Sequence, residues 1–124
     1  MRVLLVDDEE ELVGTLAERL RIRDIEADFA TTPERSLEMV REKHYDIAVL
    51  DVKMPGTSGI ELKRQLEKID AGLEYVFVTG HGSQQDFEEG VVEAGKGYYL
   101  VKPIAIELLI SKMREILGQG GEDR

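Results

Sequence analysis

Carboxylates follow two of the short apolar runs in this sequence, at the points where those runs end. Asp7 and Asp8 come directly after residues 2–6, and Asp51 comes directly after residues 47–50. Carboxylates that pack together raise one another's pKa values, so a cluster of them requires a compensating cation. Oxygen ligands in a chain without cysteine favour a hard ion, so the sequence predicts a site for Mg²⁺, or for Mn²⁺ in its place.

Two other polar residues follow later apolar runs. Thr79 comes after residues 75–78 and offers a hydroxyl donor, and Lys102 comes after residues 98–101 and offers a positive charge. A carboxylate-bound cation, a lysine and a threonine together meet the needs of a phosphoryl group with its three charged oxygens. The chemistry predicted for these residues is therefore the handling of a phosphoryl group.

One of the three carboxylates is free to act as a nucleophile. Asp7 and Asp8 form a pair suited to a metal ion, whereas Asp51 stands alone at the end of its run. A carboxylate can attack phosphorus and form an aspartyl phosphate. We therefore predict Asp51 as the residue that accepts the phosphoryl group.

The elements that must position these residues alternate along the chain. Strands are expected over residues 2–6, 25–29, 47–50, 75–78 and 98–101. Helices are expected to bury Leu12, Leu16 and Leu20, to begin at Thr32-Pro33 and at Ser58-Gly59, to cover residues 83–94, and to bury Ile106, Leu109, Ile110, Met113 and Leu117. This alternation predicts an α/β fold with a parallel sheet, right-handed crossovers and helices on both faces.

Sites in such open sheets lie beyond the carboxyl ends of the strands. The predicted topology therefore brings Asp7, Asp51, Thr79 and Lys102 to one edge of the sheet. We expect residues 1–118 to form one domain, and residues 119–124 to be a flexible tail or a truncated linker.

Composition excludes several classes of function. The 124 residues carry 16 basic and 26 acidic side chains, a net charge of −10, which disfavours direct binding to nucleic acid or to anionic membranes. The absence of cysteine excludes disulfide scaffolds, thiolate zinc sites and cysteine catalysis. With no apolar run near the length of a membrane span, we expect a cytoplasmic protein.

Four segments carry a family resemblance in the right order, each at a predicted strand end. They are residues 4–9 (LLVDDE), 49–56 (VLDVKMPG), 78–82 (VTGHG) and 99–103 (YLVKP). From about residue 2 to residue 117 the chain resembles a receiver (response regulator) domain of bacterial two-component signalling. The resemblance implies a flavodoxin-like, doubly wound sheet of five parallel strands in the order 2-1-3-4-5, with five helices.

The resemblance also implies roles for individual residues. Asp51 would take the phosphoryl group from a sensor histidine kinase or a phosphotransfer protein. Asp7, Asp8, Asp51 and the backbone carbonyl of Lys53 would hold Mg²⁺. Thr79 and Lys102 would bond to phosphoryl oxygens, and the Lys102–Pro103 peptide bond is expected to be cis.

The implied output is a conformational switch. Tyr99 matches the switch aromatic of the family, which turns inward when the Thr79 hydroxyl moves to the phosphate. The changed surface would comprise the helix over residues 83–94, the last strand and the last helix, and this face would control a partner or an attached output domain. A homodimer could form through the same face. On this interpretation the chain assists its own phosphorylation and dephosphorylation but is not a conventional enzyme.

A few positions depart from the family pattern or leave a choice. Lys96 stands where a small residue is more usual, Ile104 stands where an aromatic is common, and Tyr98 competes with Tyr99 for the switch position. We prefer Tyr99 because it lies three residues before Lys102. His81 is expected to be a solvated loop residue, and Met54-Pro55-Gly56 to form a turn without direct chemistry.

Two other functions remain alternatives. The first is a Mg²⁺-dependent phosphohydrolase with Asp51 as nucleophile; it is disfavoured because Lys53 occupies the place of the second catalytic aspartate in hydrolases of the haloacid dehalogenase type. The second is a contact module that is no longer phosphorylated. The sequence does not distinguish a stand-alone regulator from a domain of a larger regulator or hybrid kinase.

Overall fold

Strands and helices alternate along the chain in the computed structural model, which describes residues 1–80 and 99–118. The elements are β1 (Arg2–Val6), α1 (Glu10–Ile22), β2 (Glu26–Ala30), α2 (Pro33–Glu42), β3 (Ile47–Asp51), β4 (Lys53–Met54), β5 (Thr57–Ser58), α3 (Gly59–Ile69), β6 (Glu74–Thr79), β7 (Tyr99–Val101) and α5 (Ile106–Ile116). Five strands pair in parallel in the order β2-β1-β3-β6-β7. Numbering only these five long strands gives the expected order 2-1-3-4-5, so the predicted fold class is confirmed.

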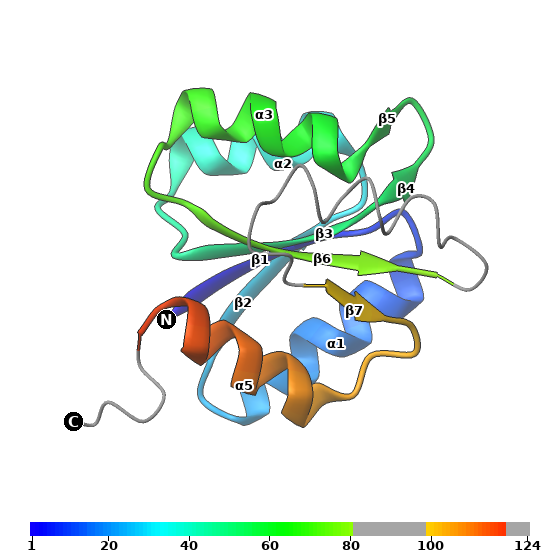
Figure 1. Cartoon of the computed structure of the whole chain (residues 1–124), viewed down its shortest axis with the longest axis vertical. Coiled ribbons are helices and arrows are strands. Elements are labelled where there is room, and N and C mark those ends of the chain that lie inside the picture. The colour runs from blue at the N-terminus through cyan, green and yellow to red at the C-terminus, as the bar shows by residue number, and fades with distance from the viewer. Residues whose placement is uncertain (81–98, 119–124) are drawn as a thin grey trace.

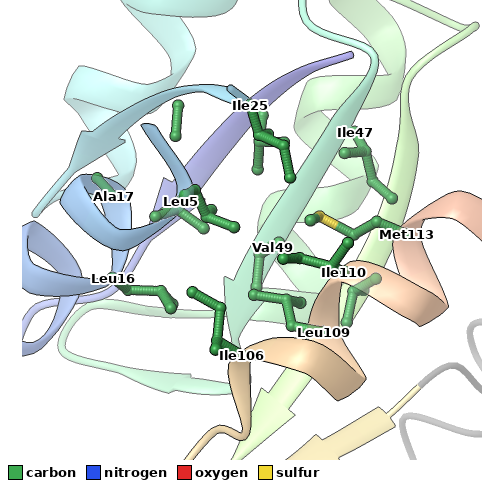
Figure 2. Close-up of a cluster of buried hydrophobic side chains, with 14 of the residues drawn as sticks. Leu5, Leu16, Ala17, Ile25, Ile47, Val49, Ile106, Leu109, Ile110 and Met113 are labelled. Atoms are coloured by element: carbon green, nitrogen blue, oxygen red, sulfur yellow. The ribbon is translucent and has the colours of Figure 1, made fainter. Parts of the chain in front are cut away.

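The sheet lies between two layers of helices (Figure 1). Helices α2 and α3 cover one face, and α1 and α5 cover the other. The central strands β1 and β3 are largely apolar because both of their faces are buried. In β1, Val3 and Leu5 pack toward α1 and α5, whereas Leu4 and Val6 belong to the core on the opposite face. Figure 2 shows the first of these cores, where side chains of α5 meet those of the central strands.

The expected helix starts are present. Thr32 caps α2 by accepting a hydrogen bond from the amide of Arg35 at 3.1 Å, and proline follows the cap. Ser58 caps α3 in the same way through the amide of Glu61, also at 3.1 Å. The described helices are also too short or too polar to cross a lipid bilayer.

Several strand boundaries differ from the predictions, and one feature was not predicted. Strand β2 begins at Glu26 instead of residue 25, because the amide of Ile25 donates to the carbonyl of Leu20 and closes the turn after α1. Strand β3 extends to Asp51. The ribbon of β4 and β5 was not predicted; it encloses the expected turn at Pro55-Gly56, where Gly56 has a φ of 88°.

Several predictions fall on residues that the structure does not describe. These are the helix over residues 83–94, the tail at residues 119–124, and the assignments of His81, Lys96 and Tyr98.

Candidate functional site

The predicted site residues meet at the carboxyl edge of the sheet. Asp51 and Thr79 are the last residues of β3 and β6, and Asp7 and Lys102 directly follow β1 and β7. Backbone hydrogen bonds hold the two flanking residues in line with the strands. The amide of Asp7 donates to the carbonyl of Ala30 at 3.2 Å, and the amide of Lys102 donates to that of Thr79 at 2.9 Å.

Three carboxylates form a cluster at this edge. One oxygen each of Asp7, Asp8 and Asp51 lies within 4.8 Å of the others. Asp7 and Asp51 are buried, at 7% and 6% exposure, whereas Asp8 is exposed. This set of oxygen donors, open to solvent on one side, fits Mg²⁺, which binds through one or two carboxylates and keeps several waters.

Asp51 lies in an environment that disfavours its charge. Burial, followed by the negative charge of Asp7, raises the pKa of Asp51 to about 6, although Lys102 and the backbone amide of Lys53 act in the opposite direction. The amide of Lys53 donates to Oδ1 of Asp51 at 3.2 Å. Additional positive charge near Asp51 would therefore favour the ionised, nucleophilic form.

Lys102 places a positively charged side chain next to these carboxylates. Its Nζ lies 2.9 Å from Oδ2 of Asp7, 2.9 Å from Oε1 of Glu9 and 3.4 Å from Oδ2 of Asp51. Burial alone would lower the pKa of Lys102, but the hydrogen bonds to Asp7 and Glu9 and the charge of Asp51 outweigh it and raise the pKa. Lys102 is therefore protonated at neutral pH. The peptide bond between Lys102 and Pro103 is cis.

The two predicted switch residues lie on neighbouring strands, Thr79 at the end of β6 and Tyr99 at the start of β7. Thr79 is buried at 4% exposure, and its hydroxyl donates to the carbonyl of Gly80 at a long 3.4 Å. This bond is weak enough for the hydroxyl to exchange it for a charged acceptor. The ring of Tyr99 stacks on the buried ring of Phe77, with centroids 5.2 Å apart. In this structure, then, the ring of Tyr99 packs inward.

Two residues at the site were missed by the sequence interpretation. Glu9 bonds to Lys102, and Gly59 packs directly on the backbone of Asp51. A signal for Glu9 was present: it occupies the position before the first helix, where serine, threonine, aspartate or asparagine is preferred. The capping pattern at Ser58-Gly59 predicted the start of the helix, but nothing in the sequence indicated that Gly59 lies against the backbone of Asp51.

Comparisons with known proteins identify the family to which the chain is similar. Residues 3–114 match the family model described as the response regulator receiver domain. The chain is 35% identical over 117 residues to the two-component response regulator PhoP of Pseudomonas aeruginosa, covering 94% of this chain and 52% of the relative. It thus spans about half the length of the curated relatives it matches.

Solved structures agree with this match. A CheY-like response regulator receiver domain protein from Methanospirillum hungatei superimposes with a TM-score of 0.83 at 26% identity, covering 99% of this chain and 98% of the other. The response regulator TrrA from Thermotoga maritima, solved in complex with Mg²⁺ and BeF, gives a TM-score of 0.77 at 28% identity, with 93% and 97% coverage.

Proposed function

Since this chain belongs to the response regulator receiver domain family, we propose that it is a phosphorylation-dependent signalling switch with Asp51 as the phosphoacceptor. The donor would be a phosphohistidine on a sensor histidine kinase or a phosphotransfer protein. A carboxylate oxygen of Asp51 attacks phosphorus, and the P–N bond breaks as the new O–P bond forms. The electron pair stays on the imidazole nitrogen, which takes up a proton from solvent.

The residues around Asp51 have distinct parts in this reaction. Asp7, Asp8, Asp51 and the backbone carbonyl of Lys53 would hold Mg²⁺, with Mn²⁺ as a substitute. When bound, the ion supplies positive charge that offsets the carboxylates and the phosphoryl oxygens. Lys102 pairs with one phosphoryl oxygen, and Thr79 donates its hydroxyl to another. The chain thereby assists its own phosphorylation and dephosphorylation, and it is not a conventional enzyme.

One observation carries the proposal most directly. The ammonium group of Lys102 lies within 3.4 Å of both Asp7 and Asp51, so a fixed cation sits beside the nucleophile and the metal-binding carboxylate at once. A carboxylate, a cluster suited to a divalent ion and a lysine in mutual contact match the charge distribution of a phosphoryl group in transfer.

The signal would leave through the face that includes β7 and α5. Phosphorylation adds about 1.5 to 2 negative charges beside Thr79, which draws the hydroxyl toward the new acceptor. The ring of Tyr99 already stacks on Phe77, so phosphorylation would hold it in this inward position rather than bring it there. Val101 of β7 and Leu108 of α5 are large apolar side chains that are 54% and 47% exposed, which supports a contact of these elements with a partner, an output domain or a second copy of the chain.

The test is phosphorylation by a small donor. We expect acetyl phosphate with Mg²⁺ to add one phosphoryl group to the intact chain, as read by mass spectrometry. The Asp51→Asn variant, or wild type without Mg²⁺, should gain none. A folded chain that binds Mg²⁺ but neither gains mass nor forms a complex with beryllofluoride would instead be a contact module.

A further inference from the structure

The side chain of Glu9, the residue before α1, bonds to Lys102 of the proposed phosphorylation site. Glu9 occupies the cap position of α1, where a side chain commonly accepts a hydrogen bond from the first helical amides. Its carboxylate makes no such bond. Instead Oε1 accepts a hydrogen bond from Nζ of Lys102 at 2.9 Å, across 93 positions of the sequence.

This contact occupies a donor that a phosphoryl group would need. A lysine ammonium has three N–H donors and no more. The three carboxylates of Asp7, Glu9 and Asp51 surround Nζ of Lys102 at 2.9, 2.9 and 3.4 Å. A phosphoryl oxygen can therefore bond to Lys102 only if one of these carboxylates gives up its place.

Glu9 is the partner that can leave without disturbing the reacting groups. Asp7 and Asp51 belong to the carboxylate cluster, whereas Glu9 is not part of it. The side chain of Glu9 is 61% exposed, so it can rotate into solvent at little cost, while that of Asp7 is only 9% exposed. Its charge also adds to the repulsion met by an anionic donor.

We propose that Glu9 is a positioning residue that slows phosphorylation by holding Lys102 away from the incoming phosphoryl group. This inference rests on the proposed function of Asp51. Releasing Lys102 from Glu9 should therefore speed phosphoryl uptake. The size of the effect should match that of one exposed ion pair, about a two- to fivefold change in rate.

Three variants separate the contact from the charge. Glu9→Gln removes the charge and weakens the bond to Lys102. Glu9→Asp keeps the charge, but its shorter carboxylate should turn to cap α1, which also releases Lys102. Glu10→Gln removes the same charge from the next residue, in the first turn of α1. With acetyl phosphate and Mg²⁺, we expect both Glu9 variants to gain phosphoryl groups about two- to fivefold faster than wild type, and Glu10→Gln to match wild type.

A double-mutant cycle with Lys102→Met identifies the route of the effect. In that background Glu9→Gln should leave the slow remaining rate unchanged, because the competing donor is gone. Two results would overturn the inference in favour of general charge repulsion. One is that Glu9→Gln accelerates phosphorylation equally with and without Lys102. The other is that Glu9→Asp is phosphorylated at the wild-type rate. An unchanged rate in Glu9→Gln would also overturn the inference.

The outcome for wild type keeps the two proposals distinct. Phosphorylation of wild type with no acceleration in the Glu9 variants would reject the role of Glu9 alone. A wild-type chain that gains no phosphoryl group and binds no beryllofluoride would reject both. Urea unfolding of each variant checks that the protein is folded under the conditions in which its phosphorylation rate is measured.

Discussion

The backbone of Gly59 lies against the carbonyl group of Asp51 so closely that a Cβ atom at position 59 would overlap with the carbonyl oxygen. The amide of Gly59 also donates to the carbonyl of Val52 at 2.9 Å, which fixes the start of α3 beside the end of β3. The position of the proposed nucleophile therefore depends on the absence of a side chain on the neighbouring helix.

Gly59→Ala should destabilise the fold and disturb the site together. The new methyl group meets backbone that cannot rotate away, so we expect a loss of about 1–3 kcal/mol in the free energy of unfolding, together with slower phosphoryl uptake. Gly14→Ala is the matched control. A Cβ there would make ordinary contacts of 3.6 Å with Phe29, and alanine should stabilise α1 by about 0.5–1 kcal/mol. Urea unfolding measures the stability of both variants. Equal effects of the two substitutions would show that the contact of Gly59 with Asp51 does not restrict position 59.

Asp51→Asn should stabilise the chain in the absence of Mg²⁺. The pKa of Asp51 is raised from 3.8 to about 6, so at neutral pH its ionisation opposes folding. Removing that charge should increase the free energy of unfolding by about 1–3 kcal/mol at pH 7. Denaturation in the presence of a chelator measures the difference. Lower stability of the variant would mean that the bond to Lys102 outweighs the burial of Asp51 and the charge of Asp7.

Asp8→Asn should weaken Mg²⁺ binding and leave the fold intact. Asp8 is the exposed member of the cluster, so its loss exposes no buried partner. We expect the melting temperature of the metal-free variant to match that of wild type. Saturating Mg²⁺, near 100 times the wild-type Kd, should stabilise wild type by about 2.7 kcal/mol and the variant by clearly less. Equal stabilisation would place the ion elsewhere.

Asp28, a carboxylate remote from the site, should contribute to the stability of the fold in acid. Asp28 accepts hydrogen bonds from the hydroxyl of Tyr45 at 2.7 Å and from Nζ of Lys43 at 3.0 Å. Burial would raise the pKa of Asp28, but these bonds and the charges of Lys43 and Arg21 outweigh burial and lower it. A lowered pKa means that Asp28 stabilises the fold above its ordinary pKa, and that this stabilisation is lost as pH falls through the folded value.

The variant Asp28→Asn tests this linkage. At pH 7 it should unfold at lower urea concentration, with a loss of about 1 kcal/mol. The gap to wild type should shrink as pH falls below the ordinary pKa of 3.8, because Asp28 then takes up a proton in the unfolded chain before it does so in the folded one. A gap that stays constant from pH 7 to pH 3 would show that the charge of Asp28 does not contribute.

Much of the fold and the core of the site could be predicted from the sequence. Apolar runs such as residues 47–50 are buried on both faces, so they stand out as strands without any tertiary information. Parallel strands end at one edge, and this rule alone brings Asp7, Asp51, Thr79 and Lys102 together. The local capping patterns at Thr32 and Ser58 likewise depend only on near neighbours in the chain.

Only the tertiary structure decided the distances between segments that no periodic sequence pattern links. The ribbon of β4 and β5 has two residues in each strand, too few to show a period of two. The approach of Gly59 to Asp51 depends on how α3 docks on β3. The pairing of Glu9 with Lys102 depends on where the chain after β7 passes α1. Sequence patterns report which residues are buried in each element, whereas contacts between loops follow from the packing of whole elements against one another.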